Sequence, residues 1–328
     1  MLKSYCRNLR TAFAWITVML VAGIVQAQDP HCSFNAATYS FEGTDVAQAR
    51  CLMRPVLKGG NLGPERALPA LLERLVGQPV SVSKDSLRRY LRAHGITEYD
   101  PVRKSEIGGS LDAPLSRADS NNRRAPFARY FVIHDTSTPN LVRELPDFPR
   151  NFNDAEWEWN RTKWNNLKLP LYDNSGEAHL YINRAGRSIT PQRRSFATAW
   201  RATRFESNSL NGTRLRGLFL HIENIQPRRC DPSVNTCCRT CIIKGKKQRC
   251  CNDAIAPDPG FSEAQLSRLA LVYVAASVRR GIWLIPVFHC VLDTHPRIPT
   301  SERHDDPQNF DVQAWANSLQ RLLTKLEN

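Results

Sequence analysis

After its first 27 residues, this 328-residue sequence lacks any hydrophobic run long enough to cross a membrane, so we expect no membrane span in the rest of the chain. Acidic residues are also few, with 31 Asp and Glu against 45 Lys and Arg. That basic excess favours an anionic partner such as a cell-wall polymer, an acidic lipid or a nucleic acid. A nucleic acid is the least favoured, because the basic residues are scattered and no recognition motif for DNA or RNA occurs. A hydrophobic content of 41% excludes a disordered chain.

Residues 1–27 have the pattern of a secretory signal peptide. Lys3, Arg7 and Arg10 give it a positively charged start. An apolar stretch follows at 11–24, and Ala27 supplies the small residue of a cleavage site. A membrane anchor is the alternative, but the apolar stretch is short for a span. Cleavage would remove those three basic residues, which lowers the net charge from +14 to about +11. We therefore expect a periplasmic or secreted protein.

Cysteine usage supports an oxidising compartment. One of the ten cysteines, Cys6, lies in the signal peptide, and most of the others should be paired. Cys32 and Cys51 could link the start of the N-terminal region. Residues 230–251 form a cysteine-dense insertion with interspersed Lys and Arg. We expect a disulfide knot there; the alternative is a zinc knuckle, because the insertion contains a pair of cysteines with metal-ligand spacing, Cys238 and Cys241.

The chain beyond residue 27 divides into two parts. Residues 28–124 are expected to form an N-terminal helical region that ends in a polar linker at 116–124, and residues 125–328 are expected to form the main domain. Hydrophobic spacing predicts N-terminal helices at 67–76 and 86–93. In the main domain it predicts strands at 130–133, 178–183, 218–225 and 283–290, and helices at 262–280 and 310–326. Strands mixed with packed helices indicate an α/β or α+β domain.

Two of the predicted strands deliver histidine to their ends. His134 follows the first strand, and His289 lies at the end of the last one, with the acidic pair Asp305 and Asp306 further along the chain. Strands that bring His, His and Asp to one edge of a sheet can assemble a catalytic zinc site, which has three protein ligands and a fourth position for water. The pattern therefore predicts a zinc centre.

Several motifs occur together in a fixed order. They are Val132-Ile133-His134, the strand and turn at 181–187, Ala199-Trp200, His221-Ile222-Glu223-Asn224, a late strand that ends in histidine, and Arg303-His304-Asp305-Asp306-Pro307 before Phe310-Asp311. This order resembles the zinc-dependent N-acetylmuramoyl-L-alanine amidases of the type 2 family, which share a fold with the peptidoglycan-recognition proteins. The resemblance covers about residues 125–328. It implies a central mixed sheet flanked by helices, one Zn²⁺ ion, and hydrolysis of the amide between N-acetylmuramic acid and L-alanine in peptidoglycan.

The resemblance also implies a set of metal ligands: His134, His289 and Asp306. Two departures from the family pattern leave rivals. Phe288 stands where the family has glycine, and the interval between His289 and the acidic pair is longer than usual, so His295 is the rival of His289. Asp305 is the rival of Asp306, which is preferred because Pro307 follows it as in the motif.

Three further residues acquire catalytic roles from the same resemblance. Glu223 is expected to be the general base that activates water, and His221 is expected to assist or orient. His304 stands where many family members carry lysine, and its imidazolium would stabilise the oxyanion. Related recognition domains that lack a complete zinc triad bind muropeptides without cutting them, so a non-catalytic peptidoglycan-binding module is the alternative function.

Overall fold

The computed structural model describes residues 32–57, 61–100, 105–137, 148, 153, 178–191, 193–207, 215–230, 240–243, 246–249, 254–300 and 303–327. The expected signal peptide at 1–27 lies outside these residues, as does most of the cysteine-dense insertion. In the described part of the chain, every helix is too short or too polar to span a bilayer.

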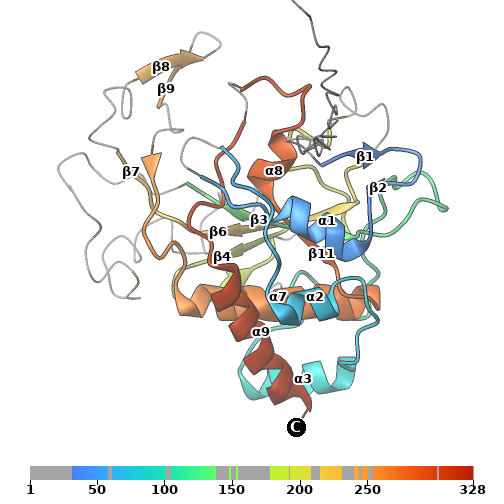
Figure 1. Ribbon diagram of the computed structural model, residues 1–328. Helices are drawn as coiled ribbons and strands as arrows, with labels where there is room; N and C mark the ends of the chain where they lie inside the picture. Colours follow the sequence, from blue (N-terminus) through green and yellow to red (C-terminus); the bar gives the residue numbers. More distant parts are fainter. Residues whose placement is uncertain are drawn as a thin grey trace, which may run out of the picture. The chain divides into compact units, whose positions relative to one another are not determined.

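A mixed five-stranded sheet forms the centre of the fold (Figure 1). Its strands, in spatial order, are β11 (Ile285–Phe288), β3 (Tyr130–Asp135), β6 (Phe219–Asn224), β4 (Leu180–Ile182) and β5 (Ser188–Ile189). The first four are parallel, and β5 pairs antiparallel with β4. All six residues of β3 are buried, as expected for a parallel strand that is covered on both faces. The prediction of an α/β domain with a mixed sheet is confirmed.

Two long helices pack beside the sheet. α7 (Glu263–Arg280) begins with a capping box, in which Ser262 and Gln265 bond each other's backbone N–H groups, and ends at Gly281 with φ of 78°. Tyr273 of α7 packs edge-on against Phe131 of β3, with ring centroids 5.2 Å apart. α9 (Val312–Glu327) joins this layer through the ring of Trp315, 5.2 Å from Tyr273. Both helices lie within two residues of the predicted ranges.

The N-terminal region packs against the same core. Its elements are β1 (Phe34–Asn35), β2 (Ser40–Phe41), α1 (Asp45–Leu52), α2 (Ala70–Leu75) and α3 (Lys84–Ala93). The expected disulfide between Cys32 and Cys51 is confirmed, with a Cα–Cα distance of 6.0 Å. The hydroxyl of Tyr130 in β3 accepts from the Phe41 amide at 2.9 Å and donates to Gln48 of α1 at 2.8 Å. The sequence did not predict α1, which is short and only weakly amphipathic; its buried Leu52 is part of the hydrophobic core.

The expected linker begins inside the protein. The Ser116 hydroxyl donates to the carbonyl of Gly217 at 3.0 Å, and the Ser116 amide donates to the carbonyl of Phe196 at 2.7 Å. Gly217 allows this approach, because a Cβ atom there would lie 1.9 Å from the carbonyl oxygen of Arg117. These contacts hold the start of the expected linker against Gly217, which lies just before the first residue of β6.

Short strand pairs occur around the cysteine-dense insertion. They are β7 (Arg229–Cys230) with β10 (Ala254–Ile255), and β8 (Thr240–Ile243) with β9 (Lys246–Arg249). Most of the cysteines expected to form a disulfide knot or a zinc knuckle lie outside the described residues, so both alternatives remain predictions.

Candidate metal centre

The candidate centre lies at the edge of the sheet where parallel strands end. His134 is the next-to-last residue of β3, and Glu223 is its partner in the neighbouring strand β6. On the other side, β11 ends at Phe288 and the chain turns into the short helix α8 (His289–Asp293). The carboxyl ends of parallel strands are the usual ligand-binding edge of α/β sheets. Strand order alone therefore brings His134, Glu223 and His289 to one place.

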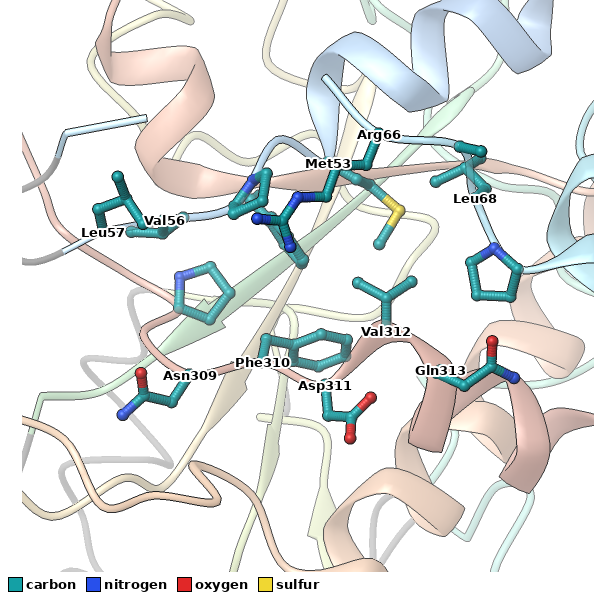
Figure 2. Close-up of a pocket in the computed structure, with 15 residues that line it drawn as sticks. Met53, Val56, Leu57, Arg66, Leu68, Asn309, Phe310, Asp311, Val312 and Gln313 are labelled. Carbon is teal, nitrogen blue, oxygen red and sulfur yellow. The ribbon is translucent and has the colours of Figure 1, made fainter. Parts of the chain in front are cut away.

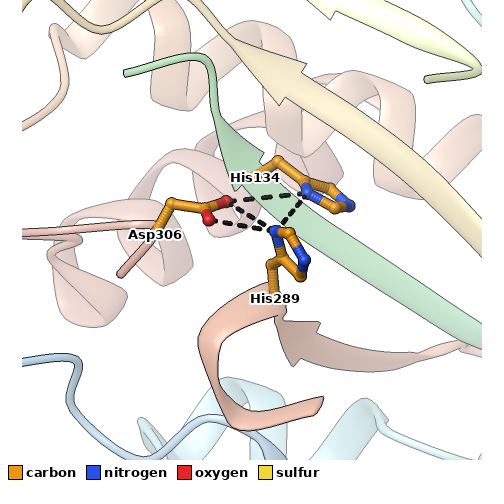
Figure 3. Close-up of side chains that lie close together, drawn as sticks. All are labelled: His134, His289 and Asp306. Atoms are coloured by element: carbon orange, nitrogen blue, oxygen red, sulfur yellow. Dashed lines mark hydrogen bonds and ion pairs between the residues drawn. The ribbon is translucent and has the colours of Figure 1, made fainter. Parts of the chain in front are cut away.

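His134, His289 and Asp306 form a close cluster at this edge. Figure 3 shows their side chains pointing toward one another from β3, from the start of α8 and from the loop before α9. The two Nδ1 atoms of the histidines are 3.0 Å apart. Asp306 Oδ2 lies 3.1 Å from His289 Nδ1 and 3.6 Å from His134 Nδ1. The exposed fractions of the His134, His289 and Asp306 side chains are 2%, 5% and 6%.

These separations fit a tetrahedral metal. Zinc ligands at ~2.0–2.1 Å from the ion in a tetrahedron are about 3.4 Å from one another, close to the three distances of the cluster. The donors are also of the appropriate kind, two imidazoles and one carboxylate. The buried group His134, His289 and Asp306 could therefore hold a metal ion.

A buried ion pair holds the loop that carries Asp306. Both carboxylate oxygens of Asp135 accept from Arg228 Nη2, at 2.8 and 2.7 Å, and one also accepts from the backbone amide of Gln308 at 3.0 Å. The backbone N–H of Asp135 in turn donates to Asp306 Oδ2 at 3.2 Å. Such a pair adds little net stability because both charges are desolvated. Its effect here is to fix one orientation of the Asp306 carboxylate.

A chain of side chains supports His134 from behind. His134 Nε2 lies 3.0 Å from His221 Nδ1, and His221 Nε2 lies 3.2 Å from Glu206 Oε1. A metal on His134 Nδ1 would place the ring proton on Nε2, which then donates to His221, and His221 donates to Glu206. The backbone N–H of His221 donates to His179 Nδ1 at 3.0 Å. The hydrogen bonds from His134 to His221 and from His221 to Glu206 therefore set the tautomer of His134, which leaves its Nδ1 lone pair directed at the cluster.

Burial keeps these rings neutral, which is the form that binds metal. It lowers the pKa of His134 to about 3, with the charge of His289 adding to the effect. The pKa values of His221 and His179 are also lowered to about 3, chiefly by burial. Glu206 is the last member of this hydrogen-bonded series, and burial raises the pKa of its carboxyl to about 8.

His289 is supported by a carboxylate instead. Its Nε2 atom lies 3.1 Å from Asp293 Oδ2, one helical turn further along α8. Burial opposes a charge on His289, but Asp306 and Asp293 outweigh it and raise the pKa of the imidazole well above its usual value. A carboxylate behind a metal-binding histidine orients the ring and increases its basicity.

The remaining predicted residues lie around the cluster at different distances. Glu223 Oε1 is 3.8 Å from His134 Nδ1, so the expected general base borders the cluster. His221 contacts His134 through its Nδ1 atom, and its expected assisting or orienting role stays a prediction. His304 contacts Asp293, and its ring stacks on that of His289 with centroids 4.4 Å apart.

The two rival ligands lie elsewhere. The His295 ring packs edge-on against Phe205, with centroids 5.5 Å apart. Asp305 contacts the side-chain amide of Gln308 and lies 3.9 Å from Arg228 Nη2. Burial raises the pKa of Asp305 to about 7, against the opposing effect of Arg228. The structure therefore brings together the preferred residues, His289 and Asp306, rather than these alternatives.

Four contributors were not identified from sequence: Asp135, Glu206, Arg228 and Asp293. Glu206 lies in an irregular loop and takes its place by accepting from Thr203 Oγ1 at 2.8 Å. Asp293 lies four positions after His289 on one face of α8, but the sequence predicted a strand that includes His289, so this helical spacing gave no signal.

A cavity of about 540 Å³ lies between the N-terminal region and residues 307–313 (Figure 2). Phe288, which precedes His289, and Pro307, which follows Asp306, contribute to its wall. The opposite wall comes from the N-terminal region, including Met53, Arg66 and Leu68. The N-terminal region therefore shares a surface with the segment that positions Asp306.

Comparisons of this chain with protein-family models, with curated proteins and with solved structures give no match.

Proposed function

We propose that this protein is a zinc-dependent N-acetylmuramoyl-L-alanine amidase, which hydrolyses the amide between N-acetylmuramic acid and L-alanine in peptidoglycan. The single observation that supports it most is the buried cluster of His134, His289 and Asp306 at the carboxyl edge of the sheet. The mixed sheet with packed helices is compatible with an amidase-like fold. A basic chain with an N-terminal export pattern suits action on an anionic wall polymer in the periplasm or outside the cell.

Zn²⁺ would be held by His134 Nδ1, His289 Nδ1 and the Asp306 carboxylate. When bound, it would polarise the scissile carbonyl and lower the pKa of water to ~7. The protein contributes the orientation of these ligands through His221, Asp293 and Asp135, each of which contacts a ligand.

Glu223 is the proposed proton carrier. Its carboxylate lies 3.8 Å from His134 Nδ1, and its side chain is 14% exposed, so it borders the cluster and stays accessible to a substrate. It would accept the proton of the attacking water and deliver it to the leaving amine of L-alanine. The nitrogen of the scissile amide thereby leaves as a neutral amine.

His304 is proposed to stabilise the negative charge that develops on the carbonyl oxygen. Asp293 contacts Nδ1 of its ring and thereby fixes the ring's orientation, while the side chain remains 49% exposed. A positioned cation is most effective when it faces charge that forms only in the transition state.

The test is release of stem peptide from purified peptidoglycan. The metal-free protein, prepared with a chelator, is expected to be inactive and to recover when Zn²⁺ is restored. His134→Ala is expected to lose the ion held by this cluster and, with it, the activity, whereas the exposed His94→Ala should keep both. If the zinc-loaded, folded protein releases no stem peptide, the amidase proposal is wrong.

A second candidate function is a non-catalytic muropeptide-binding module. It is favoured by the raised pKa of His289, because a protonated His289 can hydrogen-bond Asp306 and His134 together without a metal. The absence of stoichiometric zinc in the purified protein, together with peptidoglycan binding, would favour this candidate.

A further inference from the structure

The His289 ring also belongs to a second group of side chains that could hold a metal ion. Its Nε2 atom, across the ring from the first cluster, lies 3.1 Å from Asp293 Oδ2. The same oxygen contacts His304 Nδ1. The rings of His289 and His304 are stacked with an interplanar angle of 27°. One atom each from His289, Asp293 and His304 therefore lies within 4.8 Å of the other two.

The Asp293 carboxylate supplies an independent indication of a ligand. Its side chain is 0% exposed, and no described residue donates a hydrogen bond to its Oδ1 atom. A buried carboxylate oxygen without a partner carries an uncompensated desolvation cost. Because Oδ2 already contacts both imidazoles, a further positive group would satisfy Oδ1, and a bound cation would provide it.

We propose that His289 Nε2, Asp293 and His304 Nδ1 form a second divalent-cation site, which shares the His289 ring with the first cluster. His289 then bridges two ions, with Nδ1 directed at one and Nε2 at the other. Two imidazoles and a carboxylate suit Zn²⁺. The second ion replaces the proton on His289 Nε2 and the one on His304 Nδ1, and both protons pass to solvent.

The ligand side chains of the two sites differ in solvent exposure, and this difference determines which site binds its ion first. Every ligand of the first cluster is buried, whereas the His304 side chain is 49% exposed. Ordering an exposed side chain costs conformational entropy, and the shared imidazole must give up its proton. The second site is therefore the weaker one and fills after the first.

Filling the second site has a consequence that rests on the proposed amidase function. A cation bound to His304 Nδ1 would add positive charge next to the group proposed to face the substrate oxyanion and would restrict its movement. Zinc above the concentration that fills the first site would then change the rate of peptidoglycan hydrolysis, in the wild type but not in His304→Ala.

The test counts ions on the full chain by equilibrium dialysis against buffered free Zn²⁺, followed by elemental analysis. The wild type is expected to bind one ion and then, at higher free zinc, a second one. His304→Ala should bind only the first, and because that side chain is half exposed the variant should remain folded. His134→Ala should lose the first ion and keep the second. The exposed His94→Ala serves as the matched control and should bind two.

A single ion in the wild type throughout the titration would overturn the proposal, and so would two ions in His304→Ala. The latter result would place the second ion elsewhere, such as in the cysteine-dense stretch. The ion count and the hydrolysis assay can fail independently of each other. Two bound ions without hydrolysis would support the second site and contradict the amidase proposal. One bound ion with hydrolysis would contradict the second site and support the amidase proposal.

Discussion

The two histidine ligands of the candidate centre are supported in opposite ways. His134 rests on His221, which is neutral, whereas His289 rests on the carboxylate of Asp293. Both rings are almost fully buried, and burial opposes a charge on each. On His134 burial prevails and lowers the pKa to about 3, but on His289 the carboxylates of Asp306 and Asp293 outweigh it. Nearby charge, rather than depth of burial, therefore distinguishes the two ligands.

This difference has a chemical use in the proposed enzyme. A neutral ring is ready to bind metal without first losing a proton, and a carboxylate-backed ring is the more basic donor. The centre would thus combine one preformed ligand with one strong ligand. The following predictions test that division, in order of decreasing effect.

Replacement of His134 by alanine should have the largest effect. The variant loses one of the three proposed ligands, so bound zinc should fall from one ion per chain to background at the first site, and stem-peptide release should fall with it. Zinc content and peptide release measured on the same preparation check this. Full activity in a zinc-free His134→Ala protein would show that hydrolysis does not depend on zinc.

Replacement of Glu223 by glutamine should lower activity while leaving the metal in place. Loss of a general base costs typically 10²–10⁴-fold in rate, and Glu223 is not one of the three ligands. We expect a decrease in kcat of at least about a hundredfold with unchanged zinc content. Unchanged kcat would assign proton transfer to another group.

The two supporting carboxyls should differ in their effect on metal affinity. Asp293→Asn removes the charge in direct contact with His289 and should weaken zinc binding by about 10–100-fold. Glu206→Gln acts on His134 only through His221 and should weaken zinc binding by less than about tenfold. Zinc dissociation constants measured by competition with a chelator compare them. A larger effect of Glu206→Gln would reverse the proposed division between the ligands.

The smallest effect is expected far from both ligands. Burial opposes the charge of Glu98, but hydrogen bonds from Arg88 and from the Leu111 amide outweigh it and lower the pKa of the carboxyl. The resulting stability is present above the unfolded pKa of about 4.3 and is lost as pH falls through the folded pKa. Glu98→Gln should cost at most about 1 kcal/mol of unfolding free energy at pH 7 and flatten the acid limb of stability.

Denaturant unfolding at several pH values checks this prediction, and zinc affinity serves as its internal control. Because Glu98 belongs to a surface ion-pair group with Arg88 and Asp112, its removal should leave the metal centre unchanged. A loss of zinc in this variant would show that the N-terminal region and the centre are coupled.

The regular parts of the fold could be predicted because their patterns are local. The run Tyr130–Ile133 is apolar and β-branched or aromatic, and the helix at 263–280 carries its own cap and its own terminating glycine. The preferred ligands followed from strand ends and motif order, and the structure brings His134, His289 and Asp306 together.

The supporting residues could not be predicted because they depend on contacts between distant segments. Glu206 reaches His221 from an irregular loop, and Arg228 reaches Asp135 across more than ninety positions of the chain. Neither has a spacing or an amphipathic pattern that marks it. The helix at 45–52 was missed for a related reason, because its short, weakly amphipathic sequence is stabilised by the disulfide at Cys51 and by packing of Leu52.

X-ray absorption at the zinc edge of the purified full-length protein, loaded with one ion per chain, tests the central claim most directly. We expect nitrogen and oxygen neighbours at ~2.0–2.1 Å, an imidazole signature from two rings, and loss of this environment in His134→Ala. Sulfur neighbours at ~2.3 Å, or a zinc environment in His134→Ala identical to that of the wild type, would contradict this assignment of the ligands.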